Sequence, residues 1–305
     1  NSSARWRITR AAKVVPASPA RRSRGPRDLL KQRVITAIVL APLVLVLVLL
    51  TSTLVFAVLL SVIFLAGLWE WTRMSGLRNR PVRACLLLAY AIAMALLWPV
   101  CRSPQWWIPV LIGLLWWLLA ALWLGRYSFA ASPTRAHAVL KLLAGLLVVV
   151  PGWCAVVALH GGRVIHSPPH APWWVVFFAA IVVSADIGAY FAGSRFGGRK
   201  LAPSISPGKT WAGVYGALAC SALIGLAGGW IAHAPATLLP GVIVLALVTV
   251  AFSIVGDLFE SLIKRHAGVK DSGALFPGHG GLFDRMDSLV AALPVFALGK
   301  ALLGL

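Results

Sequence analysis

Acidic side chains are scarce in this sequence, which has eight Asp and Glu residues among 305 and 28 Lys and Arg residues. Charged residues make up 12% of the chain and hydrophobic residues 60%. Soluble globular domains carry about a quarter charged residues and less than half apolar ones. So few charges could not cover the surface of a soluble fold, which excludes that class. The composition predicts a protein whose solvent is lipid.

Cysteine is also rare, and its placement leaves no redox or zinc motif. The four cysteines are scattered through apolar segments, and no two of them have metal-ligand or redox spacing. We interpret Cys85, Cys101, Cys154 and Cys220 as small apolar packing residues.

Long hydrophobic runs fill most of the chain and predict transmembrane helices. A helix that crosses a bilayer needs about 20 mainly apolar residues. The predicted spans are 34–50, 54–71, 82–101, 106–124, 137–160, 172–193, 210–233, 238–262 and 286–304. Because backbone groups in lipid must bond to one another, we expect helices rather than open strands. The predicted fold is an all-α, polytopic membrane protein with about nine transmembrane helices.

The distribution of positive charge predicts the orientation of these spans. A formal net charge of +20 in a soluble protein would suggest nucleic-acid binding. Here, Lys and Arg alternate between rich and poor connections along the chain. The positive-inside rule then places the N-terminus and the even-numbered connections in the cytoplasm, and the C-terminus outside. We therefore predict contact with anionic lipid and no nucleic-acid partner.

Three regions follow from the composition. Residues 1–33 hold ten Lys and Arg residues without helical periodicity, which predicts a disordered cytoplasmic tail. The first long apolar run is followed at once by a second, so we expect it to remain as an anchor and not to be removed as a signal peptide. Residues 34–171 are predicted to form N-terminal transmembrane helices with little polar chemistry. Residues 172–305 are predicted to form a C-terminal transmembrane catalytic region.

Six of the eight acidic residues lie after residue 180, and the eighth predicted span carries two of them. Asp257, Glu260, Ser261 and Lys264 have the spacing i, i+3, i+4 and i+7, which places them on one side of a helix. Carboxylates within or beside a membrane are costly, so they are candidates for function. The alternative is a helix end that emerges into water with an ordinary i, i+4 ion pair.

A glycine-rich segment, residues 270–281, follows this span and leads to two further acids. Its glycines allow backbone amides to approach phosphate oxygens closely. Asp284 and Asp287 come next, three residues apart at the start of the ninth span. Several carboxylates that converge on such a loop suit a hard cation such as Mg²⁺. Phosphoryl-type transfer needs such a cation to screen charge and to align the reactants.

A third polar element joins the sixth and seventh spans. Asp186 and Tyr190 share a face of the sixth span, and residues 206–210 have the sequence Ser-Pro-Gly-Lys-Thr. We predict that this Ser-Pro-Gly-Lys-Thr turn, placed before a new helix, is a phosphate cradle, because helix N-termini favour anions. It lacks the further glycine of a Walker A loop. The alternative is a cytoplasmic basic loop with an ordinary helix cap.

Two other polar features receive structural interpretations. Glu70 ends the second predicted span beside Trp71 and is interpreted as an interfacial residue. The segment after the fifth span holds His160, His166 and His170 among prolines, and we interpret it as a loop, with a metal site as the alternative.

These motifs together resemble the signature of phosphatidate cytidylyltransferases, also called CDP-diglyceride synthases. The residues that carry the resemblance are Ser261-Leu-Ile-Lys264-Arg265, Lys270-Asp271, Gly273 and Pro277-Gly-His279-Gly-Gly-Leu-Phe-Asp284-Arg285-Met-Asp287. Residues 185–191 and 201–211 resemble a second block of that family. Ile187 and Ala212 depart from its common pattern, and the second could affect nucleotide affinity. The resemblance is strong over 184–290 and only hydropathic before that.

The resemblance implies that CTP and phosphatidic acid react to give CDP-diacylglycerol and pyrophosphate. It implies Mg²⁺, with room for a second cation, at a site facing the cytoplasm of a multi-pass protein in a bacterial inner membrane. Asp257, Asp284 and Asp287 are the implied metal ligands and catalytic residues, together with Lys264 and Arg285. The implied substrate-binding residues are Asp186, Ser206, Lys209, Thr210, Glu260, Ser261, Arg265, Lys270, Asp271 and His279. His279 either bonds phosphate or fills the turn, and a homodimer is left open.

Two other functions are compatible with intramembrane acids. A transporter also places carboxylates at breaks in its helices, but here the chemistry gathers at one side of the membrane beside a glycine-rich loop. A phosphotransferase acting on an isoprenoid lipid would need similar groups, and the signature favours phosphatidate over it.

Overall fold

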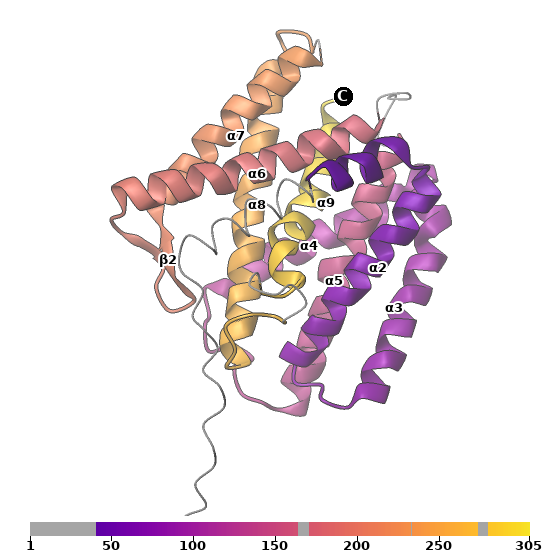
Figure 1. The fold of residues 1–305 in the computed structure, drawn as a ribbon, viewed down its shortest axis with the longest axis vertical. Helices are drawn as coiled ribbons and strands as arrows, with labels where there is room; N and C mark the ends of the chain where they lie inside the picture. The colour runs from indigo at the N-terminus through magenta and orange to yellow at the C-terminus, as the bar shows by residue number, and fades with distance from the viewer. Residues whose placement is uncertain (1–40, 164–170, 233, 274–279) are drawn as a thin grey trace, which may run out of the picture. The chain divides into compact units, whose positions relative to one another are not determined.

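The computed structural model of the chain describes residues 41–163, 171–232, 234–273 and 280–305 as a helical bundle with one small hairpin (Figure 1). A helical segment covers Ala41–Leu50. The longer helices are α2 (Thr53–Met74), α3 (Arg80–Cys101), α4 (Trp107–Leu124), α5 (Arg135–His160), α6 (Ala171–Phe196), α7 (Trp211–Ile231), α8 (Leu239–His266) and α9 (Asp287–Leu302). The strands are β1 (Lys200–Ala202) and β2 (Ser206–Thr210), and the 3-10 turns are η1 (Pro104–Trp106) and η2 (Phe283–Arg285).

Seven helices of the described residues are long and apolar enough to cross a membrane. They are α2, α3, α4 with its preceding turn, α5, α6, α7 and α8. Helix α9 is shorter, at 16 residues, as is the segment Ala41–Leu50. The all-α, multi-pass fold is therefore confirmed. The count of nine spans and the cytoplasmic N-terminus stay predictions, and the tail at 1–33 lies outside the described residues.

Local capping explains where several helices begin. Ser52, Asn79 and Thr134 precede α2, α3 and α5, and each side chain accepts a hydrogen bond from a backbone N–H three residues later. A free N–H at a helix start must find such a partner. The polar residues that interrupt the apolar runs therefore set the helix starts.

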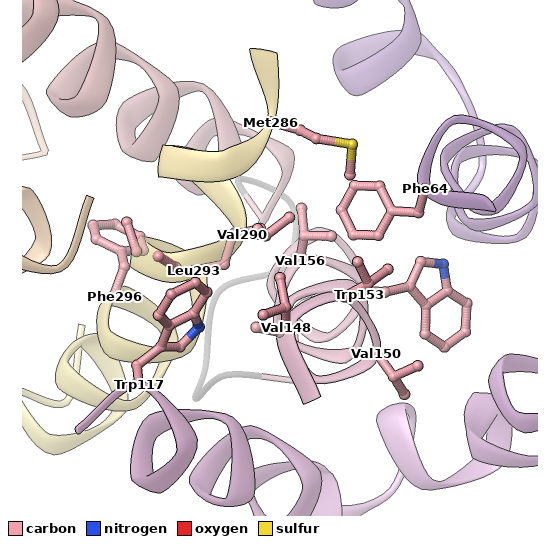
Figure 2. Close-up of a cluster of buried hydrophobic side chains, with 14 of the residues drawn as sticks. Phe64, Trp117, Val148, Val150, Trp153, Val156, Met286, Val290, Leu293 and Phe296 are labelled. Carbon is pink, nitrogen blue, oxygen red and sulfur yellow. The ribbon is translucent and has the colours of Figure 1, made fainter. Parts of the chain in front are cut away.

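Helix α5 is the most buried of the long helices and forms the centre of the bundle. Figure 2 shows Val148 of α5 beside Trp117 of α4 and Val290 of α9, all three buried. Close packing depends on Gly113 of α4, where an added Cβ would lie 2.4 Å from a side-chain atom of Pro151. A separation below 3 Å is not tolerated, so only glycine allows α4 and α5 to approach this closely.

Helices α6 and α7 form a second closely packed pair and carry the β1–β2 hairpin between them (Figure 1). An added Cβ at Gly188 of α6 would lie 2.4 Å from the carbonyl oxygen of Gly216 of α7. The strands are antiparallel, with Lys200 opposite Thr210. The prediction of a turn at residues 206–210 was wrong, because this segment is strand β2, but the predicted start of a helix directly after it is confirmed.

Candidate active site

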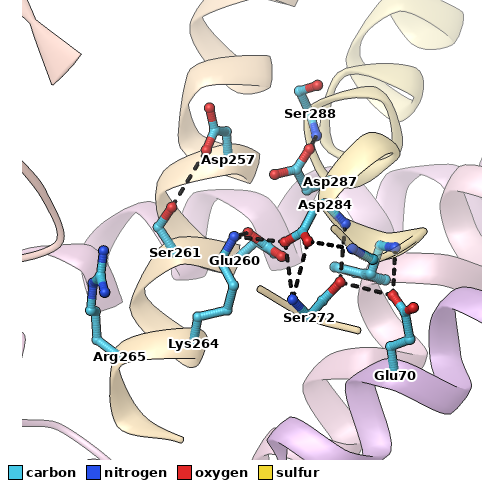
Figure 3. Close-up of polar contacts among 12 residues, drawn as sticks. Glu70, Asp257, Glu260, Ser261, Lys264, Arg265, Ser272, Asp284, Asp287 and Ser288 are labelled. Atoms are coloured by element: carbon cyan, nitrogen blue, oxygen red, sulfur yellow. Dashed lines mark hydrogen bonds and ion pairs between the residues drawn. The ribbon is translucent and has the colours of Figure 1, made fainter. Parts of the chain in front are cut away.

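The polar residues of α8 lie in two adjacent rows rather than in one stripe (Figure 3). Asp257 and Ser261 form one row, and the Ser261 hydroxyl lies 3.5 Å from Asp257 Oδ1. Glu260 and Lys264 form the other row, as an i, i+4 ion pair. The Lys264 ammonium also donates to Asp284 Oδ1 at 2.7 Å. The second row therefore links α8 to the turn that precedes α9.

The Asp284 carboxylate is held from several sides in turn η2. Its Oδ2 accepts the backbone N–H groups of Gly281 at 2.8 Å and Ser272 at 3.1 Å. Burial by itself would raise the pKa of Asp284, but the Lys264 ammonium and the Gly281 N–H, which both donate to this carboxylate, hold that pKa well below its usual range. Asp284 is thus an ionised group in a fixed orientation.

Helix α9 meets α8 closely beside this cluster. An added Cβ at Gly256 would lie 2.5 Å from the carbonyl oxygen of Asp287, so the two backbones touch there. The Asp287 side chain is buried and accepts the Ser288 N–H at 2.7 Å. Asp287 and Asp257 lie within electrostatic range of each other. The contact at Gly256 thus sets Asp287 against the backbone of α8, one residue before Asp257.

A cavity of about 360 Å³ opens next to these carboxylates. Its lining includes Asp186 of α6, Lys209 and Thr210 of β2, and Asp257 of α8. The Lys209 ammonium forms an ion pair with Asp257. Most of the remaining lining is apolar or glycine, so the cavity offers both a charged end and a surface suited to hydrocarbon. Three predicted elements, α6, the hairpin and α8, therefore meet around one space.

Sequence reasoning missed three residues of this region. Ser253 and Ser288 line the cavity, on α8 and α9. Glu70 of α2 is 7% exposed and accepts the Ser272 hydroxyl at 2.8 Å and the Phe283 N–H at 2.9 Å. The sequence analysis gave Glu70 no part in the site, whereas the structure places it under the loop that carries Asp284. The available signal was a carboxylate within an apolar span, which is costly unless it has partners.

Other predicted residues are engaged in structural contacts. Arg265 donates through Nε to the carbonyl oxygen of Ile205 at 3.1 Å and so ties the hairpin to α8. The Thr210 hydroxyl accepts the Gly213 N–H at 3.2 Å and caps α7. Ser206 lies opposite Ala202 in the hairpin. Of these three residues, Thr210 also lines the cavity.

The remaining predicted residues lie around the rim or outside the described residues. Lys270 and Asp271, at the start of the glycine-rich segment, and Arg285, just after it, are exposed. His279 lies outside the described residues, as do His166 and His170. His160 is buried and contacts Thr53 and the Val48 carbonyl oxygen, so the part of this histidine group that the structure describes is a packing contact.

Comparison with known proteins identifies the family. The profile described as "Cytidylyltransferase family" matches residues 31–302, nearly the whole chain. The chain belongs to the cytidylyltransferase family. Three curated relatives are named phosphatidate cytidylyltransferase. That of Pseudomonas aeruginosa is 40% identical over 269 residues, covering 88% of this chain and 96% of the relative. That of Haemophilus influenzae is 38% identical over 284 residues, covering 88% and 98%.

The relative from Brucella suis is 36% identical over 281 residues, covering 90% of this chain and 94% of its own length. The resemblance seen in the sequence motifs is therefore confirmed over nearly the full length. It extends through the N-terminal helices, where the sequence motifs gave only a hydropathic likeness.

The oxygen ligands of the site fit a hard divalent cation. Asp257 and Asp287 offer carboxylates from adjacent helices, and Mg²⁺ commonly takes one or two carboxylates together with substrate phosphates. Among the described residues, no three Asp, Glu, His or Cys side chains already stand at metal-ligand spacing.

Proposed function

We propose that the chain is a phosphatidate cytidylyltransferase, which converts CTP and phosphatidic acid to CDP-diacylglycerol and pyrophosphate. The observation that carries the proposal is that Asp257 and Lys209 pair at one cavity, while Lys264 of the same helix bonds Asp284 in the turn that leads to Asp287 and α9. Membership of the family and the names of the relatives give the reaction and its substrates.

The reaction depends more on positive charge near the phosphates than on a general base. An oxygen of the lipid phosphate attacks the α-phosphorus of CTP, the bond from that phosphorus to the bridging oxygen breaks, and pyrophosphate leaves. The attacking oxygen is already anionic, so the barrier lies in bringing two polyanions together. The ammonium groups of Lys209 and Lys264 lie at the carboxylates Asp257 and Asp284, and we place the substrate phosphates beside them.

We propose Mg²⁺ as the cofactor, held by Asp257, Asp284 and Asp287 together with substrate phosphates. When bound, Mg²⁺ neutralises charge on the phosphates and aligns the attacking and leaving oxygens. Asp284 already accepts three protein donors, so it orients the site as well as adding negative charge.

The lipid substrate fits an entry route from within the bilayer. Tyr190 of α6 is exposed and lines the cavity, and Ala185, Ala189 and Val214 give it apolar walls. An acyl chain can lie along this surface while its phosphate reaches the charged end of the cavity. We place the protein in the bacterial inner membrane with the site facing the cytoplasm, because its relatives are bacterial and the basic connections flank the site.

The deciding experiment is an assay of the protein in detergent micelles with radiolabelled CTP and phosphatidic acid. We expect labelled lipid and one equivalent of pyrophosphate, dependent on both substrates and abolished by a chelator. Uptake of solute into sealed vesicles without pyrophosphate release would indicate a transporter and overturn the proposal.

Asp284→Asn tests the site within the same assay. The amide removes the negative charge and turns a donor toward other donors, so turnover should fall by about 10³-fold or more. The variant should still insert and purify as a folded protein. Near-normal turnover would remove Asp284 from the active site.

A further inference from the structure

We infer that Glu70 of α2 is a positioning residue that holds the Asp284 turn in its active geometry. The inference rests on the proposed function, because it assigns a part in that reaction to a residue of the N-terminal helices. Its basis is a relay of hydrogen bonds. Glu70 Oε2 accepts the Ser272 hydroxyl at 2.8 Å, and Ser272 in turn bonds Asp284 through its backbone N–H at 3.1 Å.

Two further hydrogen bonds connect the same residues. The Ser272 hydroxyl oxygen accepts the Asp284 N–H at 3.3 Å, and Glu70 Oε2 also accepts the Phe283 N–H at 2.9 Å. Ser272 lies within the glycine-rich segment, and Phe283 begins turn η2 just after it. One carboxylate oxygen of α2 therefore joins the two sides of this segment and fixes the residue next to Asp284 (Figure 3).

Two glycines leave the space that this carboxylate needs. An added Cβ at Gly273 would lie 2.0 Å from Glu70 Oε1, and one at Gly281 would lie 1.9 Å from Ser272 Oγ. Both separations are well below any real contact, so any larger residue would push the loop off Glu70. The resemblance to the family uses Gly273 and Gly281 as motif positions, and their contact with Glu70 gives a physical reason for glycine there.

The rest of this face of α2 supports the turn. Gly67, Glu70 and Trp71 are spaced i, i+3 and i+4, so they share one side of the helix. An added Cβ at Gly67 would lie 2.7 Å from Met286 Sδ. The centroid of the Trp71 ring lies 5.0 Å from that of the Phe283 ring. The apolar contacts fix the distance between α2 and the turn, and Glu70 fixes its rotation.

A merely structural role for Glu70, as a buried acid that needs partners, makes a different prediction from positioning. Replacement by Gln keeps the length and an amide oxygen for the Oε2 position, whereas Asp keeps the charge but is one methylene too short. Positioning predicts that Glu70→Gln stays within about threefold of wild-type kcat, because both accepted bonds survive. Glu70→Asp and Glu70→Ala should each lose about 10- to 100-fold in kcat, with KM for CTP changed less than about twofold.

The matched control is Thr72→Val. Thr72 lies in the same turn of α2, is fully buried and bonds the Arg83 side chain at 2.9 Å, with no described contact to the loop. It should lower thermal stability like the Glu70 variants while leaving kcat unchanged. A loss of kcat in Thr72→Val equal to that in Glu70→Ala would show a general effect of weakening α2 and overturn the inference.

Hydrogen–deuterium exchange of the peptide 280–286 in the substrate-free protein supplies a readout that does not depend on turnover. Glu70→Ala should speed exchange by about tenfold at the Gly281 and Phe283 N–H groups, and Glu70→Gln and Thr72→Val should not. Faster exchange at Phe283 alone would show a local bond without the relay, and would refute positioning. Retained kcat in Glu70→Asp together with a loss in Glu70→Gln would show that the reaction depends on the charge of Glu70 and not on the length of its side chain, and would overturn the inference.

The two proposals fail separately. Wild-type protein that releases no pyrophosphate from CTP and phosphatidic acid refutes the proposed function, and with it the catalytic part of the inference. Active wild-type protein with unaltered exchange in Glu70→Ala refutes the positioning role alone.

Discussion

Lys264→Met should both destabilise the protein and stop turnover, for reasons that can be separated. The Lys264 side chain is 14% exposed and pairs with the carboxylates of Glu260, at 1%, and Asp284, at 13%. Met has a similar length but no charge, so the variant leaves two carboxylates without their shared cation. Removing one partner of a buried ion pair costs about 3–5 kcal/mol. For a chain of 305 residues, that lowers the midpoint of thermal unfolding by about 5–8 °C.

The double variant Glu260→Gln/Lys264→Met isolates the stability effect. Gln removes one of the two uncompensated charges, so about half of the lost stability should return. Turnover should stay at least about 10²-fold down, because the ammonium that faces the phosphates is still missing. Thermal unfolding in detergent and the radiolabelled CTP assay measure the two effects. A single variant that unfolds within about 1 kcal/mol of wild type, or a double variant with near-normal turnover, would refute this reasoning.

Three further predictions follow from the same region. Lys209→Ala should raise KM for CTP by about tenfold, since it removes the ammonium paired with Asp257 at the cavity; unchanged nucleotide kinetics would contradict this. Gly256→Ala should lower the free energy of unfolding by about 1–3 kcal/mol, because its Cβ would meet the Asp287 carbonyl, and thermal unfolding measures it. The depressed pKa of Asp284 stabilises the fold above its ordinary unfolded value near 4, so stability should fall as the pH drops below about 4 in the wild type and less in Asp284→Asn.

The sequence predicts most of the fold because the bilayer imposes it. Helix α5 was expected at 137–160 and covers Arg135–His160, and α3 was expected at 82–101 and covers Arg80–Cys101. A membrane core of fixed thickness requires apolar runs of fixed length, and the charged or capping residue that ends each run is local. The i, i+4 pair of Glu260 and Lys264 was likewise readable from helical spacing.

Contacts between distant segments could not be predicted from such local patterns. The row of Glu260 and Lys264 and the row of Asp257 and Ser261 look like one stripe in the sequence, and only the positions of η2 and the hairpin separate them. The substrate-binding role of Arg265 stays a prediction, but its bond through Nε to a backbone carbonyl of the hairpin could not be read from the sequence. The strands between residues 200 and 210 were missed because Pro203, Pro207 and Gly208 favour turns.

The bond between Glu70 and Ser272 spans 202 residues of chain, and this separation has a consequence for biosynthesis. A ribosome adding about 5–20 residues per second needs roughly 10–40 s to travel from one to the other. During that interval the Glu70 carboxylate of α2 has neither of its partners, Ser272 and Phe283, because both are synthesised later. The set of carboxylates is therefore complete only once α9 has been synthesised. A chain whose synthesis stops before α9 lacks Asp287, and we expect it to be inactive.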